Sequence, residues 1–175
     1  ILTVLLATAS YSKNKVVYGS DNRVEVFQSN NTLYSDLSKS TAAMIDSRSL
    51  NFGEDDTVTI SGGTLESRGI CSNARFSQQI TAASCSGFLV GPNLLVTAGH
   101  CITSDYDCTN QKWVFDYKES EEESIEFTVS KSKVYSCKRI IERALDRGSR
   151  DDFALIELDR EVTDRNALEF RKDGK

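Results

Sequence analysis

The sequence predicts an all-β protein, either a barrel or a sandwich of short strands. Short apolar runs rich in Val, Ile, Leu and Phe recur along the second half of the chain, and polar segments separate them. Two of these runs are joined by Gly91-Pro92-Asn93, three turn-forming residues that predict a β-hairpin. The chain shows little of the 3.6-residue apolar period that is typical of helices, so many short strands are favoured.

The hairpin is the clearest single element, with strands expected at 88–90 and 94–97. Residues 140–148 are compatible with either one helical turn or an extended strand and loop. The remaining strands of this domain are expected at 112–117, 124–130, 133–141 and 152–158.

Residues 13–70 are polar, contain no cysteine and have the character of an appendage to the β domain. Within them, 16–27 show a short strand, turn and strand pattern, and 57–69 show a strand followed by a glycine-rich break. The apolar spacing of 33–45 predicts a short helix. We therefore expect the β domain itself to comprise residues 71–175.

The first nine residues, ILTVLLATA, form an apolar run that ends in small residues. Ala7-Thr8-Ala9 resembles the cleavage site of a secretory signal. The run is too short to span a bilayer, which takes about 20 apolar residues. A buried strand is the alternative, although the run lacks alternation. We interpret 1–12 as the remnant of a secretory signal whose start lies upstream, and we expect a secreted or periplasmic protein.

The charge distribution excludes one large class of function. The formal net charge is −5, and the Lys and Arg residues are scattered among acids. A nucleic-acid surface needs clustered positive charge to displace the counterions of the phosphates. We therefore expect no nucleic-acid partner, and the short apolar run gives no reason to expect a membrane partner.

Five cysteines are many for this length, and none forms a C-x-x-C pair. The single histidine cannot complete a Cys/His zinc site of the usual spacing, so disulfides in an oxidising compartment are the simpler interpretation. The hairpin would bring Cys85 and Cys101 together. Cys108 and Cys137 bracket two strands and form a tentative second pair, although Cys71 is an alternative partner for either. The odd count leaves one thiol free or bonded outside the chain.

That single histidine, His100, lies in the run LVTAGHC, which ends at Cys101. The run resembles the histidine signature of the trypsin-like, chymotrypsin-fold serine peptidases. The preceding CSGFLV, which begins at Cys85, resembles the family strand whose cysteine pairs with the one after the histidine. The resemblance implies that His100 is the general base and acid of a catalytic triad and that Cys85 bonds to Cys101.

A second motif, DDFALIELDR at 151–160, resembles the aspartate motif of the same family. Asp152 directly precedes FALI and is the match, whereas Asp151 occupies a position where the family tolerates other polar residues. The resemblance implies that Asp152 fixes the tautomer of His100 and stabilises its imidazolium form.

The order of apolar and polar segments resembles secreted bacterial members of the family, including the glutamyl endopeptidases. Those proteins are made with a signal and a propeptide as zymogens. The resemblance implies that 13–70 are a propeptide-like segment and that 71–175 form the first, N-terminal barrel of a two-barrel fold.

The family nucleophile lies in a G-D-S-G-G motif in the second barrel, and this chain contains no G-x-S-x-G. Neither Ser86 nor Ser149 fits the position. We expect the serine, and the missing C-terminal barrel, beyond Lys175. The chain would then be an inactive fragment of an endopeptidase that acts on polypeptide substrates. The alternatives are a non-catalytic secreted β-domain used for binding, and a cysteine nucleophile on the same fold.

An acidic cluster, KESEEES at 118–124, lies between the two motifs, where some family members have a calcium loop. Its oxygen ligands would suit Ca²⁺. Such a run of charge is more commonly the solvated tip of a hairpin. We therefore expect no metal site and no cofactor.

Overall fold

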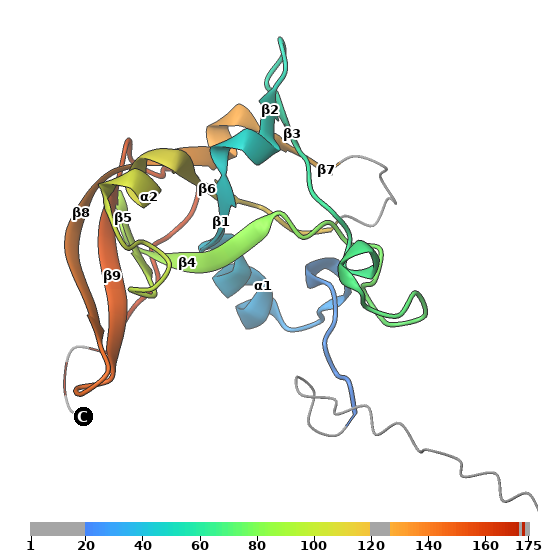
Figure 1. Cartoon of the computed structure of the whole chain (residues 1–175), viewed down its shortest axis with the longest axis horizontal. Coiled ribbons are helices and arrows are strands. Elements are labelled where there is room, and N and C mark those ends of the chain that lie inside the picture. Colours follow the sequence, from blue (N-terminus) through green and yellow to red (C-terminus); the bar gives the residue numbers. More distant parts are fainter. Residues whose placement is uncertain (1–19, 120–126, 172, 174–175) are drawn as a thin grey trace, which may run out of the picture.

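The strands of the chain close into a six-stranded antiparallel barrel, and a smaller three-stranded sheet lies beside it (Figure 1). This computed structural model describes residues 20–119, 127–171 and 173. Neighbouring strands follow the order β1-β4-β5-β9-β8-β6 around the barrel and β2-β3-β7 in the second sheet. The predicted all-β class is confirmed.

The barrel strands are β1 (Thr41–Asp46), β4 (Ala83–Gly91), β5 (Leu94–Thr97), β6 (Gln111–Phe115), β8 (Val134–Asp146) and β9 (Asp151–Leu158). The second sheet contains β2 (Leu50–Phe52), β3 (Thr57–Ile60) and β7 (Phe127–Ser130), and the two helices are α1 (Thr32–Lys39) and α2 (Asp105–Asn110). Among the described residues, no helix is long and apolar enough to cross a membrane.

Strand β1 is buried on both faces because it lies between the two apolar cores. Met44 belongs to the cluster inside the barrel, whereas its neighbour Ile45 packs in the cluster shared with the three-stranded sheet. Successive side chains of a strand point to opposite faces, which explains this alternation. Along the barrel wall, Met44 lies opposite Cys85 of β4 and Trp113 of β6. Without β1 the barrel would be open.

Residues upstream of β1 are also attached to the domain. The guanidinium of Arg75 donates to the backbone carbonyls of Asp21 and Arg23, and Gln79 Nε2 donates to Glu25 Oε1 at 2.5 Å. Together with β1, these contacts extend the folded unit well upstream of residue 71. The expected domain boundary at that residue therefore does not coincide with the start of the barrel.

The expected strands of the second half are present in the described residues, and the 88–97 hairpin is formed by β4 and β5 as predicted. Of the strand expected at 124–130, residues 124–126 lie outside the described residues. The helix expected at 33–45 is shorter, because α1 ends at Lys39 and the following residues are drawn into the barrel as β1. In the pattern expected at 16–27, residues 16–19 lie outside the described residues. Residues 20–25 form no strand, and Val26–Gln28 form a 3₁₀ turn.

Residues 140–148 form a strand and turn, since β8 continues to Asp146. Helix α2 is an element that the sequence did not predict. Two contacts hold it: Asp107 Oδ2 accepts hydrogen bonds from the backbone and hydroxyl of Thr103, and Cys108 is bonded to Cys137 of β8.

The chain after β9 runs back over the barrel, and we call residues 159–168 the C-terminal strap. Backbone hydrogen bonds join Val162 to Pro92 at 2.7 Å and Leu168 to Leu89 at 2.7 Å. The hydroxyl of Ser40 donates to the carbonyl of Asn166 at 2.5 Å. The strap is therefore attached to the turn and strand of the central hairpin and to the start of β1.

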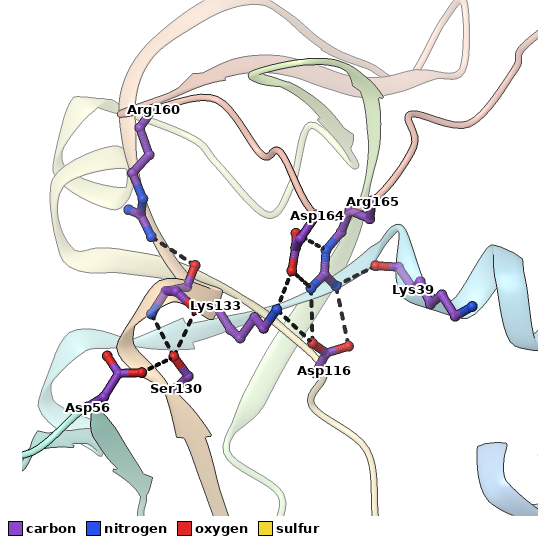
Figure 2. A network of polar contacts seen from close by, with 9 residues as sticks. Lys39, Asp56, Asp116, Ser130, Lys133, Arg160, Asp164 and Arg165 are labelled. Carbon is purple, nitrogen blue, oxygen red and sulfur yellow. Dashed lines mark hydrogen bonds and ion pairs between the residues drawn. The ribbon is translucent and has the colours of Figure 1, made fainter.

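A network of charges fixes the middle of the strap (Figure 2). The side chain of Arg165 is 4 % exposed and pairs with Asp116 at 3.0 Å and with Asp164 at 2.8 Å. Its guanidinium also donates to the carbonyl of Lys39 at 2.6 Å. Lys133 lies between the same two carboxylates and pairs with both. A buried guanidinium requires such partners, because an unpaired buried charge is costly.

Candidate active site

The pairing of β5 with β9 brings together two segments that are far apart in the sequence. Thr97, the last residue of β5, lies opposite Ala154 of β9. The chain leaves β5 into the turn that carries His100, and it enters β9 at the residues that include Asp152. Both predicted site residues therefore lie at the same end of two adjacent strands.

Asp152 contacts His100 at two points. Its Oδ1 accepts a hydrogen bond from the backbone N–H of His100 at 2.9 Å, and its Oδ2 lies 2.8 Å from His100 Nδ1. The side chain of His100 is 61 % exposed, and that of Asp152 is 42 % exposed. The imidazole is thus oriented by the carboxylate and remains open to solvent.

The hydrogen bond from the ring of His100, supported by backbone N–H groups, holds the pKa of the Asp152 carboxyl below its usual value. Asp152 is therefore ionised at neutral pH, and an ionised carboxylate only accepts hydrogen bonds. This assigns the hydrogen of a neutral imidazole to Nδ1 and leaves a lone pair on Nε2. Such a ring can take a proton at Nε2 while Asp152 stabilises the resulting positive charge.

Gly99 is required by the close packing of this turn. A Cβ at this position would lie 2.0 Å from the carbonyl oxygen of Ala144 and 2.9 Å from that of Phe153. The Gly99 carbonyl in turn accepts a hydrogen bond from Arg143 Nε at 2.7 Å. The turn is therefore pressed against β8 and β9, which fixes the backbone of His100. The sequence indicated a tight turn here but gave no signal for Arg143.

The disulfide between Cys85 and Cys101 ties the other side of the turn to β4, with 6.1 Å between the two Cα atoms. The hydroxyl of Thr97 adds a buried hydrogen bond to the carbonyl of Ser86 on the same strand at 2.8 Å. His100 thus follows a residue packed on β8 and β9 and precedes one bonded covalently to β4.

The second disulfide joins Cys108 to Cys137, and Cys71 is exposed and outside both bonds. The two disulfides are the pairs expected from the sequence. The sequence left Cys71 as an alternative partner for Cys108 or Cys137, and in the structure Cys71 is the free thiol. Cys85, His100 and Cys101 also form a cluster of potential metal ligands, but the two sulfurs are bonded to each other and offer no thiolate. Of the acidic cluster at 118–124, residues 120–124 lie outside the described residues.

Neither of the serines considered from the sequence is hydrogen-bonded to the imidazole. Ser86 is on β4, and Ser149 is on the β8–β9 turn, where its hydroxyl bonds to Asp146 and Asp151. In the part of the chain that the structure describes, no serine hydroxyl is hydrogen-bonded to His100. The site therefore contains an oriented base without an adjacent nucleophile among these residues.

A closed barrel that presents a carboxylate-oriented histidine at the ends of adjacent strands defines a domain of the chymotrypsin-fold hydrolases. A sequence model of the trypsin family matches residues 38–171, and the chain belongs to that family. The match begins just before β1, in agreement with the extent of the barrel. No curated protein matches the sequence. The trypsin family consists of peptidases that hydrolyse polypeptide substrates.

Proposed function

We propose that this chain supplies the histidine and aspartate of a secreted serine endopeptidase, with His100 as the general base and Asp152 as its orienting acid. The observation that carries the proposal is the double contact of Asp152 with His100, on its backbone N–H and on Nδ1. That arrangement holds both the position of the ring and its tautomer, the two properties that proton transfer requires.

In the proposed reaction, Nε2 of His100 takes the proton of a serine hydroxyl as its oxygen attacks the peptide carbonyl. The same nitrogen then gives the proton to the departing amine, and Asp152 stabilises the imidazolium in between without becoming protonated. The serine and the N–H groups that stabilise the oxyanion belong to a second barrel encoded beyond Lys175. By itself the chain would not hydrolyse peptides.

Secretion forms part of the proposal. Two disulfides in a chain of this length favour an oxidising compartment, and the apolar run at 1–9 has the character of a signal remnant. The first nineteen residues lie outside the described residues. Removal of the whole segment 13–70 is not proposed, because it would remove β1 from the barrel and β2 and β3 from the second sheet.

The test compares the 175-residue chain with a longer protein that is translated from the same gene and continues beyond Lys175. We expect the longer product to contain G-D-S-G-G and to hydrolyse fluorescent casein, and we expect His100→Ala to abolish this activity. The chain alone should give no turnover above buffer. Turnover by the chain alone would contradict the proposal that the nucleophilic serine lies outside this chain. A longer product with neither serine motif nor activity would favour the binding domain.

A further inference from the structure

The peptide group that joins Gly99 to His100 is hydrogen-bonded at both ends. Its carbonyl oxygen accepts a hydrogen bond from Arg143 Nε at 2.7 Å, and its N–H donates to Asp152 Oδ1 at 2.9 Å. The C=O and N–H of a trans peptide point in opposite directions, so the arginine and the aspartate hold one rigid unit from opposite sides. We propose that Arg143 is a positioning residue, which holds this peptide so that Asp152 can orient the imidazole.

The hydrogen bond from Arg143 is charge-assisted, because a guanidinium stays protonated. Donation to the carbonyl polarises the amide and strengthens the N–H at the other end of the same peptide. After the ring of His100, that N–H is the next largest influence that lowers the pKa of Asp152. In the described part of the chain no salt bridge joins Arg143 to Asp152. The arginine therefore acts on the carboxylate through the peptide.

A bulge in β8 brings Arg143 to the turn. The register of β8 against β9 shifts between Ile140 and Glu142, so that Arg143 lies opposite Ala154. Directly opposed residues of antiparallel strands share a face, and Ala154 is fully buried inside the barrel. Without the extra residue, position 143 would lie opposite Phe153, whose side chain is exposed, and would point to the other face of the sheet.

The surroundings of Arg143 explain why its hydrogen bond goes to a backbone group. Its side chain is half-buried, and it forms no ion pair with any other described residue. The carbonyl oxygens of Ala144 and Phe153 face Gly99 on the same turn, so backbone acceptors crowd this region. A side-chain donor placed among them satisfies the Gly99 carbonyl and fixes the direction of the peptide.

Two substitutions separate the hydrogen bond from the bulk of the side chain. Glutamine carries its Nε2 the same number of bonds from Cα as the Nε of arginine, so Arg143→Gln keeps a neutral donor. Methionine has a methyl group at that point, so Arg143→Met keeps the length and removes the donor. Arg147→Met is the matched control, because Arg147 is exposed in the β8–β9 turn.

His100 is the only histidine of the chain, so its ring can be observed without ambiguity. The experiment labels the histidine of the full chain with nitrogen-15. Long-range proton–nitrogen spectra are recorded at the alkaline end of a pH titration, where the ring is neutral. The wild type and Arg147→Met should show a protonated Nδ1 and an unprotonated Nε2. In Arg143→Met the two nitrogen shifts should move toward each other, because a loosely oriented ring exchanges between its tautomers. Arg143→Gln should lie closer to the wild type.

Identical nitrogen shifts in Arg143→Met and the wild type would overturn the proposal. Shifts in Arg143→Gln that equal those of Arg143→Met would also overturn it, because restoring the donor would then have no effect. Circular dichroism and urea unfolding accompany the spectra. Arg143→Met should keep the β-sheet spectrum, and loss of the fold would give Arg143 a structural role in place of the proposed one.

The kinetic consequence rests on the proposed function. In the longer protein we expect Arg143→Met to lower kcat about 10-fold to 100-fold and to leave KM within about twofold. Arg143→Gln should recover kcat to within about threefold of the wild type. A higher KM with unchanged kcat would overturn the positioning role. Since the ring spectra need no activity, an inactive longer protein would refute the proposed function, and the spectra would still decide the role of Arg143.

Discussion

Asp152 holds His100 by its backbone and by its ring at the same time, through Oδ1 at 2.9 Å and Oδ2 at 2.8 Å. The two contacts make the carboxylate both a structural partner of the turn and an electrostatic partner of the imidazole. Because both side chains are exposed, the geometry is maintained by the surrounding strands and turn rather than by burial of the two groups.

Replacement of Asp152 by Asn tests the electrostatic role. An amide can donate to Nδ1, which places the hydrogen of the neutral ring on Nε2, where it blocks proton acceptance. In the longer protein proposed above, we expect kcat to fall by about 10⁴. Steady-state hydrolysis of a peptide substrate measures this. Asp151→Asn is the matched control, since Asp151 bonds to Ser149 and not to His100, and it should leave kcat nearly unchanged.

Replacement of Gly99 by Ala tests the close packing of the turn. The added methyl would overlap the carbonyl oxygen of Ala144, so the turn must move away from β8. We expect a loss of about 1–3 kcal/mol in the free energy of unfolding, measured with urea. Gly148→Ala, in the exposed β8–β9 turn, should change that free energy by less than about 0.5 kcal/mol. Equal effects of the two substitutions would show that the turn is not tightly packed.

Replacement of Arg165 by Met tests the strap network. The guanidinium lies 4.6 Å from the centre of the Phe115 ring and pairs with Asp116 and Asp164 while almost fully buried. Its loss leaves these carboxylates without their main partner, and we expect a cost of about 3 kcal/mol in urea unfolding. Arg139→Met removes a pair in which the arginine is 64 % exposed and leaves Glu157 paired with Lys138, so it should cost less than about 1 kcal/mol. A similar cost for both variants would contradict the proposal that the buried Arg165 pairs stabilise the fold more than an arginine pair at the surface does.

The same network predicts a pH dependence. The hydrogen bond from Arg165, with help from Lys133, holds the pKa of the Asp164 carboxyl well below its usual value. A carboxyl whose pKa is lower in the folded state stabilises the fold above its unfolded pKa, about 3.9, and this stabilisation is lost as the pH falls. Since the side chain is 39 % exposed, we expect Asp164→Asn to cost at most about 1 kcal/mol at pH 7.

Urea midpoints at pH 7 and in strong acid measure this difference between the wild type and Asp164→Asn. The difference should shrink as the pH falls below about 4. Asp36→Asn is the control, because its pair with Lys39 is exposed on both sides and should contribute little at either pH. If the difference between the wild type and Asp164→Asn grew in acid, the ionised Asp164 carboxylate would not be stabilising the fold as predicted.

Local patterns in the sequence predicted the parts of the fold that are formed locally. The turn residues Gly91-Pro92-Asn93 are sufficient to indicate the β4–β5 hairpin. The sequence motifs around His100 and Asp152 indicated the site through their resemblance to the family. The strand β1 was missed because its alanines and preceding polar residues have no strand signature of their own. Its conformation is determined by β4 and β6, whose residues occur much later in the chain.

The strap network illustrates a second limit. Arg165, Asp116 and Lys133 are dispersed along the chain, and each would be expected on a solvated surface from its residue type alone. Only the closed barrel brings them together, so no local sequence pattern predicts the ion pairs. The contact of Arg143 with the Gly99 carbonyl is of the same kind, since a bulge-containing β8 determines where that side chain reaches.

Closure of the barrel also imposes an order on assembly. Strand β1 is made early but needs β4 and β6 as neighbours. Strand β5 pairs locally with β4, but its other edge needs β9, whose Ala154 lies opposite Thr97. Contacts between residues so distant in sequence form slowly, because the entropy of long loops is lost before the contacts compensate for it. During synthesis on the ribosome, His100 emerges before Asp152, because Asp152 lies 52 residues further along the chain. The contact between these two residues thus reports that β9 has paired with β5, one of the last strand pairings that the chain can form, and it can be used to follow co-translational folding.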